Sequence, residues 1–143
     1  MFFGIELDEI FRILMQLGIA YVLALPVGWN RESKEKRNAG LRTFPLVAIA
    51  SCGYMIVGMQ VLTTTDAESR VLVGVITGMG FIGGGAILKD DSGVSGTATA
   101  ASLWVTGALG LAVAFNRYEV AMALSLVTYL TLQLIPHVKE QAE

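Results

Sequence analysis

Seven polar residues have the chemistry to bind an anion or a polar head group, and all of them lie near the ends of uncharged stretches. Arginine and lysine donate hydrogen bonds to carboxylates and phosphates, and threonine hydroxyls both donate and accept. If these segments come together, the residues form one polar cluster that either binds such a ligand or stabilises the protein internally. The candidates for this polar cluster are Arg31, Glu32, Arg42, Thr43, Lys89, Thr97 and Thr99.

Arg42 stands out among these residues because small and apolar residues surround it, in Gly40-Leu41 before it and Thr43-Phe44 after it. A guanidinium in apolar surroundings needs hydrogen-bond acceptors. Arg42 therefore either pairs with Glu32, binds backbone carbonyls at a helix end, or contacts a ligand. An internal role and a ligand-binding role both stay open.

No group of residues resembles a catalytic site. The single histidine, His137, follows Pro136, and no nucleophile has an evident base. Cys52, the only cysteine, lies in an apolar stretch, which favours packing over reactivity. Asp90 and Asp91 are most simply part of a solvated loop, with a cation site as the alternative. We predict a protein that is not an enzyme and holds no cofactor or metal. The net charge of −2 and scattered basic residues predict no nucleic-acid partner.

The uncharged stretches that must position these residues are long. Hydrophobic residues make up 54% of the 143 residues and charged residues only 15%. Uncharged intervals run over 13–30, 43–65, 71–88, 92–116 and 120–138. A helix of about 20 residues crosses the roughly 30 Å hydrocarbon layer. We therefore predict an all-α, single-domain bundle of five transmembrane helices. The expected spans are 10–29, 43–62, 71–88, 97–115 and 119–136.

The basic residues predict the orientation of these spans. Connections on the cytoplasmic side of a membrane carry more lysine and arginine than those on the other side. Alternate connections divide the basic residues seven to three, which places the N-terminus outside and the C-terminus in the cytoplasm. The larger group is Arg31, Lys34, Lys36, Arg37, Arg42, Lys89 and Lys139, and the smaller is Arg12, Arg70 and Arg117.

Glycines are concentrated in the third stretch, where Gly74 and Gly78 form one small-residue pair and Gly80 and Gly84 another. Residues four apart share a helix face, so a neighbouring backbone can approach closely there. We predict a helix-packing seam, with the fourth stretch as one partner surface. The alternative is that three consecutive glycines break the helix and expose backbone groups as a site. The seam is assigned to Gly74, Gly78, Gly80, Gly83, Gly84, Gly85, Ala101 and Trp104.

Three segments resemble the membrane domain of the MgtC/SapB family: "NAGLRTFPLVAIASCG", "RVLVGVITGMGFIGGGAILKDD" and "GTATAASLWVTGALGLAVAF". They lie in order within residues 28–120. The chain departs from the family pattern at Phe44, where histidine is usual, and at Met79, where isoleucine is common. Members involved in virulence also carry a soluble C-terminal domain, which is absent before the chain ends at Glu143. Functions of that domain are therefore not expected here.

The resemblance implies a bacterial inner-membrane protein linked to low-magnesium adaptation and, in pathogens, to survival in host cells through partners such as the F-type ATP synthase. We expect a non-enzymatic regulator that acts through helix contacts, as a homodimer or with another inner-membrane protein. A transporter of Mg²⁺ or another small solute is the alternative, although the five uncharged intervals contain no ionisable carboxylate. A second alternative is a scaffold that binds membrane lipids or anions through Arg31 and Arg42.

The predicted orientation can be tested by cysteine labelling. With Glu35→Cys or Ala67→Cys in intact cells, an impermeant thiol reagent should modify only the second variant, because residue 67 is predicted to lie outside. Modification of residue 35 alone would invert the topology.

Overall fold

The computed structural model describes residues 6–34, 39–91 and 93–141, with side chains described up to residue 135 and not at residue 34. Five helices account for most of this part of the chain, so the prediction of an all-α protein with five helices is confirmed. A short antiparallel hairpin was not predicted. The elements are α1 Leu7–Lys34, α2 Thr43–Val61, α3 Thr65–Gly85, β1 Leu88–Asp90, β2 Gly93–Ser95, α4 Thr97–Ala114 and α5 Tyr118–Gln141.

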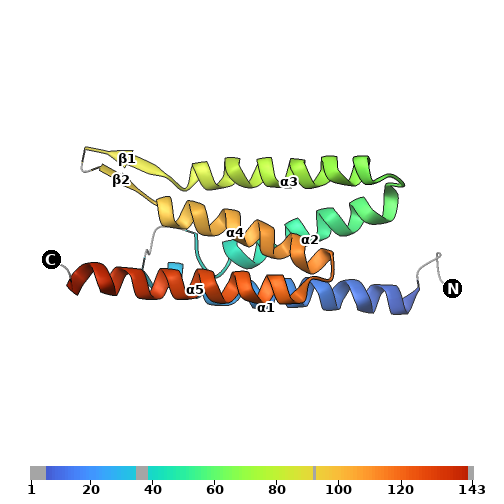
Figure 1. Cartoon of the computed structure of the whole chain (residues 1–143), viewed down its shortest axis with the longest axis horizontal. Coiled ribbons are helices and arrows are strands. Elements are labelled where there is room, and N and C mark those ends of the chain that lie inside the picture. The colour runs from blue at the N-terminus through green and yellow to red at the C-terminus, as the bar shows by residue number, and fades with distance from the viewer. Residues whose placement is uncertain (1–5, 35–38, 92, 142–143) are drawn as a thin grey trace.

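The helices run up and down, so their connections alternate between two ends of the bundle (Figure 1). One end holds the end of α1, the start of α2, the hairpin, the start of α4 and the end of α5. We call this the basic end. The other end holds the start of α1 and the connections 62–64 and 115–117. The helix ends that share a side in the predicted topology therefore lie together, while their orientation in a membrane stays a prediction.

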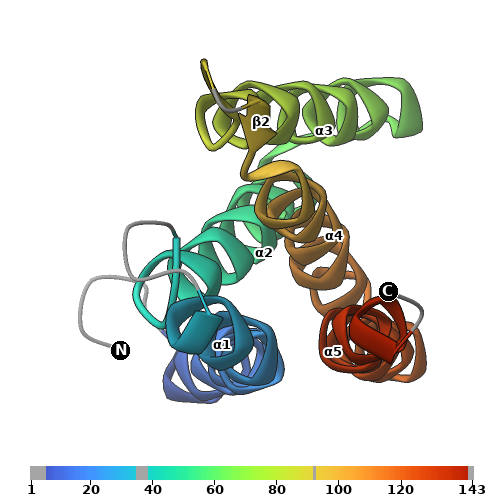
Figure 2. The same ribbon diagram turned by 90° about the vertical axis from the view of Figure 1, so that its left-hand side faces the viewer.

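Helix α4 occupies the centre of the bundle and contacts all four other helices, whereas α3 lies on one side against α4 and α2 (Figure 2). The composition of α4 explains this position, because it consists largely of alanine, glycine, serine and threonine. Its buried hydroxyls bond within the helix: Thr106 Oγ1 donates to the Ser102 carbonyl at 2.8 Å, and Ser102 Oγ donates to Ala98 at 2.6 Å. Small side chains with satisfied hydroxyls allow close packing on several sides.

The closest helix crossings are made by glycines of α4. A Cβ on Gly110 would clash with the Ala48 carbonyl oxygen of α2, and a Cβ on Gly107 would lie 2.6 Å from Met79 Cγ of α3. From the α3 side, only Gly83 has a comparable contact, with the Ala100 carbonyl oxygen 3.1 Å from the position of a Cβ. Within the described chain, the glycines that allow the tightest helix packing therefore belong to α4.

The seam predicted on α3 is confined to Gly83 within this chain. A Cβ on any of the other five glycines assigned to the seam would meet no atom within 4 Å among the described residues. Ala101 is exposed and Trp104 is 56% exposed, so neither is tightly packed within the described chain. Helix α3 also continues through the three consecutive glycines and ends at Gly85, so the helix break expected as the alternative does not occur. The five open glycines are Gly74, Gly78, Gly80, Gly84 and Gly85.

In the described part of the chain, four helices are long and apolar enough to cross a membrane, namely α1, α2, α4 and α5. Helix α3 has 21 residues, but its first turns carry acidic Asp66 and Glu68 followed by Arg70. Thr64 caps this polar start by accepting a hydrogen bond from the Ala67 backbone N–H at 3.2 Å. This cap and the acidic first turn explain why α3 begins at residue 65, ahead of the predicted boundary at 71.

The hairpin replaces the predicted last turn of the third span. Leu88 pairs with Ser95 and Asp90 pairs with Gly93 across the two strands. Gly96 then starts α4 at a φ of +82°, where the Ala86 carbonyl oxygen occupies the space of a Cβ. Only glycine satisfies both the positive φ and this close approach. The hairpin is therefore joined tightly to the helix that follows it.

Substituting a tightly packed glycine and substituting an open glycine should have opposite effects on the free energy of unfolding. Gly110→Ala should lower the free energy of unfolding by about 1–3 kcal/mol, because its methyl group overlaps the Ala48 carbonyl. Gly80→Ala should raise it by up to about 1 kcal/mol, because alanine favours a helix and meets open space. Thermal unfolding in detergent measures both, and equal effects would contradict the assignment of the tight crossing to α4.

Candidate functional site

Arg31 is buried at the basic end of the bundle, with only 4% of its surface exposed. Its Nη2 donates to Asn30 Oδ1 at 2.9 Å, and Asn30 Nδ2 donates to Gln133 Oε1 of α5 at 2.8 Å. These bonds join the end of α1 to α5. Because hydrogen bonds offset the cost of burying polar groups, this arrangement gives Arg31 an internal role.

Glu32 positions the start of α2. Its Oε2 accepts a hydrogen bond from the Leu41 backbone N–H at 2.6 Å, and its side chain packs against Gly40. The Gly40 carbonyl in turn accepts from the backbone N–H groups of Thr43 and Phe44, at 3.0 and 3.1 Å. Among the described residues, Glu32 therefore binds the backbone that precedes α2 and forms no ion pair with Arg42.

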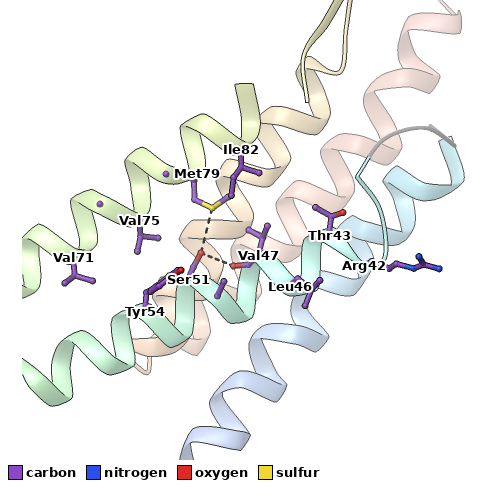
Figure 3. Close-up of a pocket in the computed structure, with 13 residues that line it drawn as sticks. Arg42, Thr43, Leu46, Val47, Ser51, Tyr54, Val71, Val75, Met79 and Ile82 are labelled. Carbon is purple, nitrogen blue, oxygen red and sulfur yellow. Dashed lines mark hydrogen bonds between the residues drawn. The ribbon is translucent and has the colours of Figure 1, made fainter. Parts of the chain in front are cut away.

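Arg42 is exposed, contrary to what its apolar neighbours in the sequence suggest. It immediately precedes α2, and its side chain extends away from α3 (Figure 3). Thr43 is half-buried at the first position of the helix. The two residues stand at one end of a groove between α2 and α3.

The other three members of the predicted polar cluster lie around the hairpin and the start of α4. Lys89 is exposed on β1, where it pairs with Val94 of β2. Thr97 is exposed, and Thr99 is fully buried in the first turn of α4. The seven predicted residues thus share the basic end of the bundle without converging on one pocket.

The groove between α2 and α3 has a volume of about 740 Å³. Its floor includes Ser51 and Met79, both buried, and Ser51 Oγ donates to the Val47 carbonyl at 2.9 Å and lies 3.9 Å from Met79 Sδ (Figure 3). The lining is otherwise mainly aliphatic. It consists of Arg42, Thr43, Leu46, Val47, Ala50, Ser51, Tyr54, Val71, Gly74, Val75, Gly78, Met79 and Ile82.

This groove was not predicted from the sequence, although the glycine pair at Gly74 and Gly78 was its signal. Four-residue spacing placed both glycines on one face, and we interpreted that face as a contact surface. Instead, the absent side chains leave one wall of the groove open.

Gln16 is a second residue that the sequence analysis missed. It is 1% exposed within an apolar stretch of α1. Its Nε2 donates to the carbonyls of Val113 and Ala114 at 3.2 and 3.3 Å, and to Asn116 Oδ1 at 3.1 Å. The last carbonyls of a helix have no partner within that helix. Gln16 therefore caps α4 from a position about a hundred residues earlier in the chain.

The described residues include no group of three or more histidine, cysteine, aspartate or glutamate side chains placed to hold a metal ion. Asp90 and Asp91 are both exposed at the hairpin. The side chain of His137 lies outside the described residues. Within the described part of the chain, the basic end thus offers donors for an anion, and the groove offers an apolar surface.

Comparison with known proteins finds bacterial proteins of similar sequence. The sequence model of the MgtC family matches residues 17–141. YhiD of Escherichia coli K12, which its name describes as a candidate magnesium transporter, is 34% identical over 129 residues, covering 85% of this chain and 60% of YhiD. Protein SapB of Bacillus subtilis is 34% identical, covering 88% and 57%. Protein MgtC of Salmonella typhimurium LT2 is 30% identical, covering 82% and 49%.

The chain thus spans about half to three fifths of the length of these curated relatives. No solved structure matches it.

Removing the cap on α4 should destabilise the protein. Gln16→Leu keeps a side chain of similar size but leaves the Val113 and Ala114 carbonyls without this donor, so the free energy of unfolding should fall by about 1–3 kcal/mol. Gln60→Leu is the matched control, because Gln60 is exposed and bonds only Glu9 among the described residues. Equal losses in thermal unfolding would show that Gln16 does not act as a cap.

Proposed function

Because the chain belongs to the MgtC family, we propose that it works as a non-enzymatic module of the bacterial inner membrane, in which α3 contacts a second membrane protein. That partner is another copy of the chain or a different inner-membrane protein. The name of its relative YhiD refers to magnesium transport, and we assign this module a regulatory role in adaptation to low magnesium.

The exposure of α3 is the observation that carries this proposal. Only Met79 and Gly83 of its 21 residues are buried in the described structure. Phe81 is 86% exposed, and it lies beside two open glycines, Gly80 and Gly84. An aromatic side chain next to glycines four residues apart allows a second helix to approach the α3 backbone closely. We call Gly80, Phe81 and Gly84 the outward face of α3.

The buried polar groups favour this role over transport. Among the described residues, the buried polar side chains are uncharged except for Arg31, which lies at the basic end and donates a hydrogen bond to Asn30. Coupled transporters usually hold an ionisable residue near the middle of the membrane. The described interior contains no buried carboxylate, although the name of YhiD keeps magnesium transport as the alternative.

Self-association in native membranes tests the outward face of α3. Gly84→Leu should weaken self-association about tenfold, equivalent to ~1.4 kcal/mol, because the added side chain prevents a second helix from approaching closely. Gly18→Leu on α1 is the matched control, since its Cβ also meets open space. Crosslinking yield or single-molecule photobleaching measures the change, and an unchanged dimer fraction would show that the outward face does not join two copies of the chain.

A flux assay separates regulation from transport. Proteoliposomes that contain the purified chain should take up Mg²⁺ no faster than protein-free liposomes. Uptake that requires the protein and disappears in Gly84→Leu would overturn the regulatory role.

A further inference from the structure

We propose that the α2–α3 groove binds one acyl chain of an anionic phospholipid, whose phosphate lies beside Arg42. The groove and the outward face of α3 involve different sides of the helix, so this inference does not rest on the partner contact proposed above. Shape, lining and charge each support it.

The groove is closed at one end and open at the other. Toward the 62–64 connection, α2 and α3 meet, and a Cβ on Gly58 would lie 3.4 Å from the Val71 methyl groups. The opposite end, at Arg42 and Thr43, belongs to the basic end of the bundle (Figure 3). A ligand in the groove therefore extends inward from the membrane boundary at the basic end.

The length of the groove corresponds to one leaflet. Its lining on α2 runs from Arg42 to Tyr54, which is about 18 Å at 1.5 Å per residue. The hydrocarbon layer is about 30 Å thick, so the groove passes slightly beyond its middle. A transmembrane helix of a partner needs a seat along the whole thickness, whereas a lipid chain occupies one leaflet. The volume of the groove, about 740 Å³, is also within the ~300–1,000 Å³ of pockets that bind small ligands.

The lining is suited to a hydrocarbon chain. Aliphatic side chains such as Leu46, Val75 and Ile82 form most of its surface, and Gly78 adds depth where a side chain would fill it. The hydroxyl of Ser51 on the floor already donates to the Val47 carbonyl, so it needs no ligand acceptor. A flexible apolar chain can fill such a surface without leaving a buried polar group unsatisfied.

Charge determines which lipid fits. Arg42 is the one charged residue among the described residues that line the groove, and it stands at the open end. Its exposed side chain extends away from α3 (Figure 3). A long, exposed arginine side chain reaches lipid phosphates when the basic end lies at the membrane surface. An arginine there attracts anionic head groups. Arg31, which was paired with Arg42 as a lipid ligand in the prediction from sequence, is buried, bonds Asn30 and does not line the groove.

Native mass spectrometry of the whole purified chain tests the proposal. The probes are palmitoyl-oleoyl phosphatidylglycerol and phosphatidylcholine, which share their acyl chains and differ in charge. One phosphatidylglycerol should be retained per protomer in preference to phosphatidylcholine. Arg42→Gln should reduce that preference about fivefold, the effect of one arginine near an anionic surface.

Filling the groove should remove the bound lipid. Gly78→Leu places a side chain in open space within the groove, and Leu46→Trp fills the same space from α2, where Leu46 is exposed. Either variant should lower retention of both lipids at least tenfold with an unchanged melting temperature before lipid is added. Gly18→Leu adds the same bulk at an open position on α1 and should retain lipid normally.

Two results would overturn the proposal. The first is lipid retention that is equal in the original chain and in folded groove-filling variants. The second is a loss of dimer in those variants with lipid retention unchanged, which would show that the groove receives a second copy of the chain.

Discussion

The close approach of α4 to α2 at Gly110 is the contact on which the rest of the bundle depends. In lipid, helices gain little by hiding apolar surface from one another, so they associate where backbones can come close. Gly110 lies against the Ala48 carbonyl, and Gly107 admits Met79 from α3. Helix α4 thereby becomes the centre that the other helices surround. A larger side chain at Gly110 would push α4 away from α2, and one at Gly107 would push α4 away from α3.

Hydrogen bonds between distant segments complete this packing at both ends of the bundle. Gln16 binds the last carbonyls of α4, and Ser125 Oγ of α5 donates to the Leu23 carbonyl of α1 at 2.6 Å. At the basic end, Asn30 bonds Gln133, and Glu32 binds the backbone before α2. The buried bonds among these satisfy polar groups that have no water available inside a membrane. These polar residues therefore belong to the architecture, and they leave Arg42 as the exposed cation beside the groove.

Helix α3 has a different status from the other four. Its contacts are limited to one side, and its glycines leave space on two others. One of these sides forms the α2–α3 groove, and the second is the outward face of α3 around Phe81. A lipid in the groove and a partner on the outward face would thus contact the same helix. Lipid composition and partner binding would then be coupled through the position of α3, with no catalytic or metal chemistry required.

The sequence by itself determined the number and approximate limits of the helices, because uncharged stretches and their charged borders depend only on local composition. It also identified the family, through motifs in those same stretches. The tertiary structure alone decided which small residues are packed and which polar residues are buried. Glycine spacing predicts a face open to close approach, yet Gly80 meets nothing in the described chain and Gly110 meets a carbonyl. Likewise Arg31 is buried and Arg42 exposed, because burial depends on which distant helix lies opposite.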